Sequence, residues 1–257
     1  MYCQPKRFRT ILQGLAALLL FTAMAAAGVP GLCNTGLSNG SGVCTGPLVA
    51  DGMGLTDANW QIAVMPSLPT SGSNFMPNPC AAANSPEWVT PTLGFVPAWV
   101  DDPDLAWLPN STTYTAIASE WITPQVEDGV GGHYIYAISF PVPASAGHVT
   151  IVGKLLSDNE VHAIYLSYGL PGNVSNSFTE CIPIAGYPYD NAAVNGPEDF
   201  FSPWTEFGVV KAPVPTDGSP ATLYFVVRNR GVGGIDSNPT DTGLRVRFDQ
   251  TSSEFLP

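Results

Sequence analysis

Apolar and polar residues alternate with a period of two at several places along the chain, which is the pattern of β-strands that bury one face. The clearest example lies near the C-terminus. There Leu244, Val246 and Phe248 fall on one face. Arg245 and Arg247 fall on the other. The predicted strands are residues 133–140, 149–155, 161–167, 223–229 and 244–248.

Clusters of Gly, Pro, Asn and Asp separate these short strands, which favours an antiparallel β-sandwich over a parallel sheet with crossover helices. We therefore predict an all-β fold with one sandwich domain over residues 28–257. Two segments, 66–110 and 171–203, are rich in proline and aromatic residues and lack the alternation. Because proline cannot donate to a sheet ladder, we predict that both are loop insertions outside the central strands.

The N-terminus has the features of a secretory signal peptide. Three basic residues within the first nine positions precede an uncharged apolar run, residues 15–27, that ends in small residues. This run is too short for a permanent transmembrane helix. We predict a signal peptide at residues 1–27, cleaved after Ala25 or Ala27. The mature protein is then secreted, extracellular or periplasmic, without a transmembrane anchor.

Composition narrows the possible partners. The 257 residues include 25 Pro and 26 Gly, which argues against a helical bundle, and 45% hydrophobic residues, which argues against disorder. Loss of the signal leaves 6 basic against 21 acidic residues, a net charge of −15. Nucleic-acid binding depends on Lys and Arg that neutralise phosphates. We therefore expect no nucleic-acid partner.

The cysteines indicate disulfides. One of the five lies in the predicted signal, and Cys33, Cys44, Cys80 and Cys181 remain. An even number in an oxidising compartment predicts two disulfides, for which four cysteines allow three pairings. The turn dipeptide Asn39-Gly40 favours Cys33–Cys44, which leaves Cys80–Cys181 as a long-range tie between the two loop insertions. No CxxC pair is present, which argues against a zinc site.

Aromatic residues in the loop insertions are the candidate ligand-binding residues. An exposed aromatic ring can stack on the C–H face of a sugar while polar neighbours bind its hydroxyls. Trp88, Trp99, Trp107, Tyr187 and Tyr189 fit this role. The alternative is that they anchor the loops to the sandwich. Three other tryptophans adjoin apparent strands and are assigned to the core: Trp60, Trp121 and Trp204.

Acidic clusters offer a weak calcium candidate. Asp101, Asp102 and Asp104 place three carboxylates within four residues, and calcium binds loop oxygens of this kind. A second cluster precedes the last predicted strand, at Asp236, Asn238 and Asp241. Neither has EF-hand spacing, so solvated loop acids are the simpler interpretation. We expect no other cofactor.

Catalytic patterns are weak. Residues 36–40 match G-x-S-x-G, but they lie in the predicted disulfide loop instead of between a strand and a helix. Glu198, Asp199 and Glu206 are the best carboxylates for glycoside hydrolysis, because aromatic residues surround them. The mature histidines form no compact metal motif: His133, His148 and His162. We therefore expect no enzyme, and keep a glycoside hydrolase as the less favoured alternative.

The order of motifs between residues 119 and 248 resembles that of galactose-binding-like jelly-roll domains in bacterial exported proteins, including many with a PEP-CTERM sorting tail. The similar pieces are Ser119-x-Trp121-Ile122, Gly132-His133-Tyr134-Ile135-Tyr136, Asp158-Asn159, Ile164-Tyr165-Leu166, the aromatic stretch 200–207, the strand 223–229 and Thr242-Gly243-Leu244-Arg245-Val246. The resemblance implies a jelly-roll β-sandwich that serves as a binding or surface-associated module.

Two differences from these domains affect that expectation. A Leu-Asn-Gly turn is common in them, whereas this chain has Leu166-Ser167-Tyr168-Gly169. The chain also ends at Pro257 without a hydrophobic sorting tail. We predict an exported, non-catalytic module that binds a polysaccharide or another cell-surface polymer through loop aromatics. The alternative is a structural or adhesive surface protein that binds a protein partner.

Overall fold

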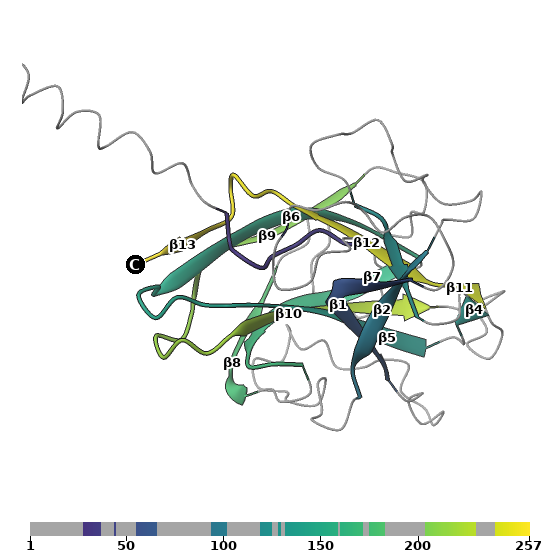
Figure 1. Cartoon of the computed structure of the whole chain (residues 1–257), viewed down its shortest axis with the longest axis horizontal. Coiled ribbons are helices and arrows are strands. Elements are labelled where there is room, and N and C mark those ends of the chain that lie inside the picture. Colours follow the sequence, from purple (N-terminus) through teal and green to yellow (C-terminus); the bar gives the residue numbers. More distant parts are fainter. Residues whose placement is uncertain are drawn as a thin grey trace, which may run out of the picture.

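The computed structural model describes residues 28–36, 44, 55–65, 94–101, 119–124, 128–129, 132–158, 160–171, 175–182, 204–229 and 240–257. All regular elements in these ranges are β-strands (Figure 1). The strands are β1 (Leu55–Met65), β2 (Val96–Asp101), β3 (Trp121–Thr123), β4 (Asp128–Gly129), β5 (Gly132–Phe140), β6 (His148–Asp158), β7 (Glu160–Tyr168), β8 (Ser175–Cys181), β9 (Thr205–Pro213), β10 (Ala221–Asn229), β11 (Thr240–Asp241), β12 (Gly243–Phe248) and β13 (Glu254–Leu256).

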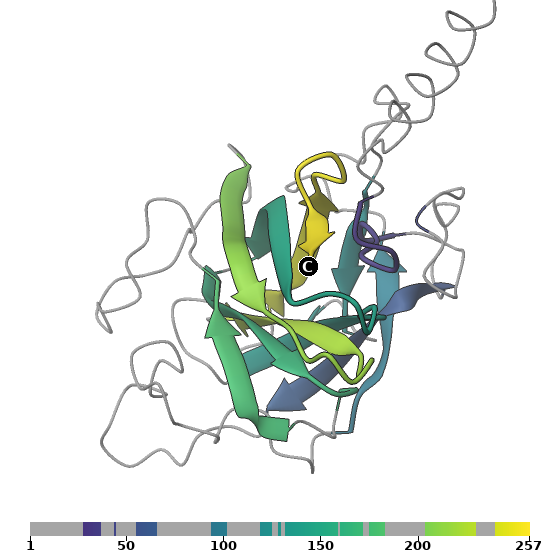
Figure 2. The same cartoon turned by 90° about the vertical axis from the view of Figure 1, so that its left-hand side faces the viewer.

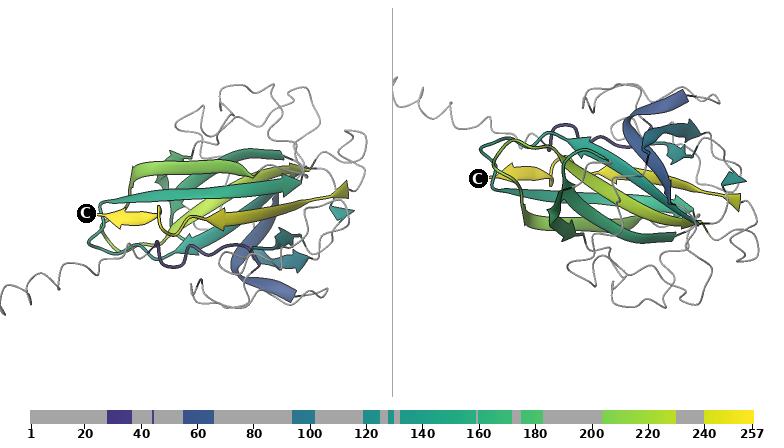
Figure 3. Two further views of the ribbon diagram at one scale, coloured as in Figure 1. Left: turned by 90° about the horizontal axis from the view of Figure 1, so that it is seen from above. Right: turned by 90° about the horizontal axis from the view of Figure 1, so that it is seen from below.

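The strands form one strongly curled antiparallel sheet, apart from the small β4–β11 pair. Its order is β13-β6-β12-β3-β2-β1-β5-β10-β7-β8, and β9 pairs with the other edge of β6. Figure 3 shows one layer from above, where β6 lies between β9 and the β12–β13 segment. The second layer contains β1, β5, β10, β7 and β8, and the turned view in Figure 2 shows both layers. The predicted all-β sandwich of jelly-roll class is confirmed.

The alternating pattern places its apolar face between the layers. In β5, Tyr134, Tyr136, Ile138 and Phe140 are all buried in the main core, as the sequence predicts. All five predicted strands are present, each lengthened by one to a few residues. Trp60 is fully buried, with its ring centroid 5.4 Å from that of Phe225. Burial of this apolar face is the main stabilising contribution to the fold.

The segment at residues 28–36 covers the part of the β12 edge that lies beyond its pairing with β3. Thr35 donates from its backbone nitrogen to Val246 O and accepts from Val246 N through its hydroxyl, at 3.2 and 3.1 Å. Phe248 N donates to Asn34 Oδ1 at 2.8 Å. Gly36 has a φ of 86°, and a Cβ there would lie 2.9 Å from Glu120 N, so only glycine fits this approach. This edge of the sheet is thus covered by the chain itself.

Two strands lie inside segments predicted to be loops, and these expectations were wrong for the residues concerned. β2 falls within 66–110 and pairs with β1 and β3, while β8 falls within 171–203 and pairs with β7. Pro97 pairs with Gln61 of β1 and precedes the residues of β2 that pair with β3. Proline is tolerated there because no described strand pairs with it on the β3 side, so no ladder hydrogen bond is lost on that side. No helix within the described residues is long and apolar enough to span a membrane.

Candidate functional site

The outer face of the second layer, on the side away from the core, carries side chains in rows across its strands. Gln61 of β1 is opposite Ala137 of β5, which is opposite Tyr224 of β10 and then Tyr165 of β7. The next row holds Ser139, Thr222 and Ser167, and we call these three residues the hydroxyl row. Antiparallel register therefore brings polar groups from three strands side by side.

A pocket of about 260 Å³ opens on this face. Its lining combines two amides and a hydroxyl with apolar groups, and the residues are Asn59, Gln61, Ala137, Ser139, Leu170 and Pro171. Amide and hydroxyl groups bind sugar hydroxyls, and the apolar groups offer contact to C–H bonds. The described lining residues are all uncharged.

The turn after β7 is fixed beside this pocket. Gly169 N donates to Pro220 O at 2.8 Å, and the hydroxyl of Thr222 donates to Gly169 O at 2.6 Å. Gly169 has a φ of 105°, which a side-chain-bearing residue adopts only with strain. Leu170, whose side chain is 56% exposed, is thereby held at the edge of the pocket. The apolar part of the lining is fixed before any ligand arrives.

A stacked pair of tyrosines lies next to the pocket. The rings of Tyr165 and Tyr224 are 5.0 Å apart and nearly parallel, and Phe95 packs on Tyr224 with centroids 6.1 Å apart. Burial raises the pKa of Tyr165 well above its usual value, and Tyr224 raises it further. Burial also raises the pKa of Tyr224. Both phenols keep their protons near neutral pH.

Buried hydroxyls on this face lack hydrogen-bond partners. Tyr165, Tyr224 and Ser167 are 3%, 0% and 1% exposed, and the oxygens of their hydroxyls make no hydrogen bond of acceptable geometry. An unpaired buried hydroxyl costs about 1–3 kcal/mol. None of the three is among the described residues that line the pocket, so these unpaired hydroxyls are a local cost of the fold.

Of the five aromatic residues predicted to bind ligand, Trp99 lies within the described residues. It is half-buried on the outer face of β2, because its neighbours Ala98 and Val100 point into the core. Trp99 pairs with Thr56 and Thr123 and does not line the pocket. The other four lie outside the described residues: Trp88, Trp107, Tyr187 and Tyr189. Their predicted role remains a prediction.

The predicted disulfide between Cys33 and Cys44 is confirmed, with Cα atoms 4.7 Å apart. Cys181 ends β8, opposite Tyr165 in β7. Its predicted partner Cys80 lies outside the described residues. Cys33, which forms this disulfide, also accepts a 3.1 Å hydrogen bond at its carbonyl oxygen from Trp60 Nε1.

The calcium candidate falls mostly outside the described residues. Asp101 ends β2, and Asp102 and Asp104 are not described. In the second cluster, the backbone of Asp241 is in β11. Within the described part of the chain, no three His, Cys, Asp or Glu side chains gather in a way that could hold a metal ion.

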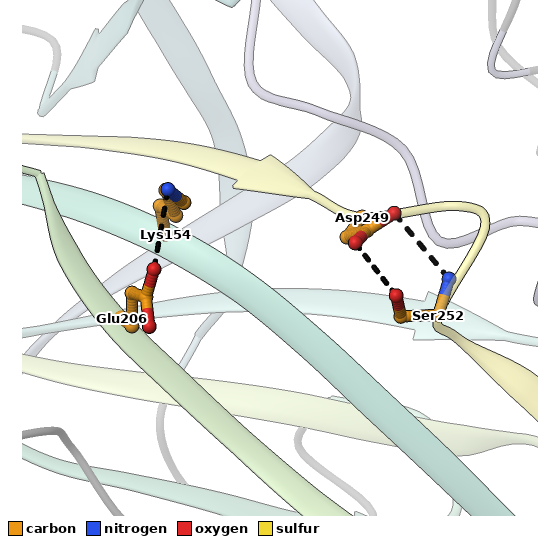
Figure 4. A network of polar contacts seen from close by, with 4 residues as sticks. All are labelled: Lys154, Glu206, Asp249 and Ser252. Atoms are coloured by element: carbon orange, nitrogen blue, oxygen red, sulfur yellow. Dashed lines mark hydrogen bonds and ion pairs between the residues drawn. The ribbon is translucent and has the colours of Figure 1, made fainter.

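The described member of the predicted hydrolase group lies in the other layer. Glu206 of β9 is exposed and forms an ion pair with Lys154 of β6 at 3.2 Å (Figure 4). The other two acids, Glu198 and Asp199, lie outside the described residues. An exposed carboxylate paired with a lysine in solvent does not fit the acid of a glycosidase, which acts from a cleft across the sugar from a second carboxylate.

The core assignment holds for Trp60 and Trp121, which are both fully buried, and in part for Trp204. Trp60 is in the main core, whereas Trp121 and Trp204 pack with Leu156 in a separate cluster on the outside of the first layer. Trp204 is partly buried, and the guanidinium of Arg245 lies 5.3 Å from its ring centroid. Burial lowers the pKa of Arg245 to about 10, although Glu120 raises it. This cluster is a structural contact between β3, β6 and β12.

The sequence reasoning missed the pocket because it searched the loops. Asn59, Gln61 and Ser139 are the polar members of alternating strands, and the alternation alone assigns them to solvent. In the observed register, these residues lie on the same face of neighbouring strands, and a correct prediction of the register would have identified them. The sequence matches no protein-family model and no curated protein.

Proposed function

We propose that this protein is an exported, non-catalytic module that binds a carbohydrate or a related cell-surface polymer. The observation that carries the proposal is the pocket on the outer face of the second layer, where two amides and a hydroxyl stand beside apolar groups. Sugars present hydroxyls and C–H faces together, and this lining complements both. The secretory features of the N-terminus and the Cys33–Cys44 disulfide are consistent with export.

The lining supports binding over hydrolysis. Among the described residues, its polar members are Asn59, Gln61 and Ser139, none of which can serve as the carboxylic acid of a glycosidase. A protein partner has less support. Within the described part of the chain, the exposed large apolar residues are Leu55, Val96, Leu170 and Val210. They lie on four different elements and form no single row in the sheet register, unlike the contiguous apolar patches of protein interfaces.

A glycan array probed with the mature protein tests the proposal, with and without a calcium chelator. We expect binding to one class of neutral glycans, and we expect Gln61→Ala to weaken it at least fivefold. Lys154→Ala, on the outside of the other layer, is the matched control and should bind as the wild type does. Wild-type protein that binds no glycan would overturn the proposal. Binding that Gln61→Ala and Asn59→Ala leave unchanged would overturn the assignment to this pocket.

A further inference from the structure

The hydroxyl row fixes the direction of its own hydrogen bonds. Gly169 O is a carbonyl and can only accept, so the hydroxyl proton of Thr222 is committed to it at 2.6 Å. Ser139 Oγ lies 2.8 Å from Thr222 Oγ1. A hydroxyl has one proton, so in this bond Ser139 donates and Thr222 accepts.

Ser139 is therefore left with acceptor capacity alone. Its proton points at Thr222, while its free lone pairs are available to the pocket that the side chain lines. A ligand atom that meets Ser139 must bring a proton. Hydroxyls do so, whereas carboxylate, ether and carbonyl oxygens do not.

The other polar lining groups impose no such direction. The amide of Gln61 carries donors and an acceptor, so it can meet either kind of ligand group. The described lining includes no cation to compensate a ligand carboxylate and no carboxylate to favour a ligand ammonium. The directional contact at Ser139 is thus the one that discriminates between ligands.

We propose that Ser139 is a specificity-determining residue that accepts a hydrogen bond from a hydroxyl of a neutral sugar, and that the pocket rejects uronic acids at this position. This inference rests on the proposed carbohydrate-binding function and names the substrate class and the contact within it. A uronate carboxylate at Ser139 would place its lone pairs against those of Ser139 Oγ. The described lining has no cation that would offset this repulsion.

Deoxy and deoxyfluoro sugars test the direction of the bond. The probes are the methyl glycosides of glucose, galactose and mannose, each with its monodeoxy and monodeoxyfluoro derivatives, titrated into the mature protein by NMR. A fluorine takes the place of the hydroxyl but has no proton to donate. At the sugar position that meets Ser139, we expect both derivatives to bind about fivefold to tenfold more weakly than the parent. A fluoro derivative that binds like the parent, where the deoxy derivative does not, would show that Ser139 donates and would overturn the inference.

The variant Ser139→Ala provides a second measurement. It should lose about the same affinity for the parent glycoside and should no longer distinguish the parent from its derivatives at that one position. Full discrimination by Ser139→Ala would overturn the inference. The wild-type series needs no variant, so a folding defect in Ser139→Ala leaves the test intact. Lys154→Ala is the control and should match the wild type.

The outcomes separate this inference from the proposed function. Absence of binding to every glycoside and array glycan overturns both. Binding with Ser139→Ala equal to wild type, or methyl glucuronide and galacturonide bound as tightly as the neutral glycosides, overturns the inference alone. Neutral binding at least tenfold tighter than uronate binding, lost in Ser139→Ala, supports both.

Discussion

Replacement of Thr35 by valine tests the segment that closes the edge of β12. The hydroxyl of Thr35 donates to Glu120 O at 2.5 Å and accepts from Val246 N at 3.1 Å. Thr35 is fully buried, so valine fits the same space but leaves a carbonyl and an N–H without partners. Each buried group left unpaired costs about 1–3 kcal/mol, and the added methyl returns about 1 kcal/mol. With two groups left unpaired, we expect a net loss of about 1–5 kcal/mol in the free energy of unfolding.

Urea denaturation of the oxidised mature protein measures this loss, followed by tryptophan fluorescence because Trp60 adjoins the segment. Thr35→Ser is the matched control. It keeps both hydrogen bonds and removes one buried methyl, which costs about 1 kcal/mol. The reasoning is refuted if Thr35→Val is as stable as Thr35→Ser, since packing would then outweigh the hydrogen bonds.

Three other predictions concern single residues. Lys211 has a φ of 56° in the bulge of β9, a conformation that glycine adopts without strain. Lys211→Gly should therefore raise the free energy of unfolding by about 0.5–1 kcal/mol in urea denaturation. The control Lys154→Gly should lower it. A Cβ at Gly153 would lie 2.5 Å from Phe207, so Gly153→Ala should destabilise by about 1–3 kcal/mol in the same assay. Hydrogen bonds from neighbouring hydroxyls lower the pKa of Asp249 to about 2 (Figure 4). Because the folded pKa lies below the unfolded value, its stabilisation is present above about pH 4 and lost towards pH 2, and Asp249→Asn should remove that pH dependence of stability.

The period-two pattern was sufficient to predict the core. Tyr136, Leu223 and Val246 each lie in a strand that alternation alone located, and all three are fully buried between the layers. The spacing of Cys33 and Cys44 around a turn dipeptide likewise predicted their disulfide. These features depend on local sequence, which one chain displays directly.

The pocket could not be predicted in the same way. Gln61 and Ser139 are far apart in sequence and meet only because β1 and β5 pair in one register. A shift of either strand by one residue would turn its own side chain of this pair into the core. β2 was missed because Pro97 and the nearby tryptophans indicate a loop locally, whereas the pairing with β1 and β3 is a property of the folded sheet.

One carboxylate connects the N-terminal segment to the pocket. Asp57 is buried, and one of its oxygens accepts from Gly36 N at 2.6 Å. The other oxygen accepts from the backbone nitrogens of Asn59 and Trp60, at 2.7 and 3.0 Å. In the bulge of β1, the four residues 57–60 lie opposite the single residue Ala98 of β2. The hydrogen bonds to Asp57 stabilise this bulge and so set the position of Asn59 in the pocket.

Asp57→Asn should therefore affect both stability and binding, whereas Thr35→Val should affect stability alone. The asparagine amide would direct a donor at a backbone N–H, so that one of these bonds is lost and Asn59 moves. We expect the affinity for a methyl glycoside bound by the wild type to fall at least threefold in Asp57→Asn and to stay unchanged in Thr35→Val. Both affinities are measured by NMR titration well below the melting temperatures. Equal losses of affinity in the two variants would mean that the pocket responds to global stability and not to the bonds that Asp57 makes.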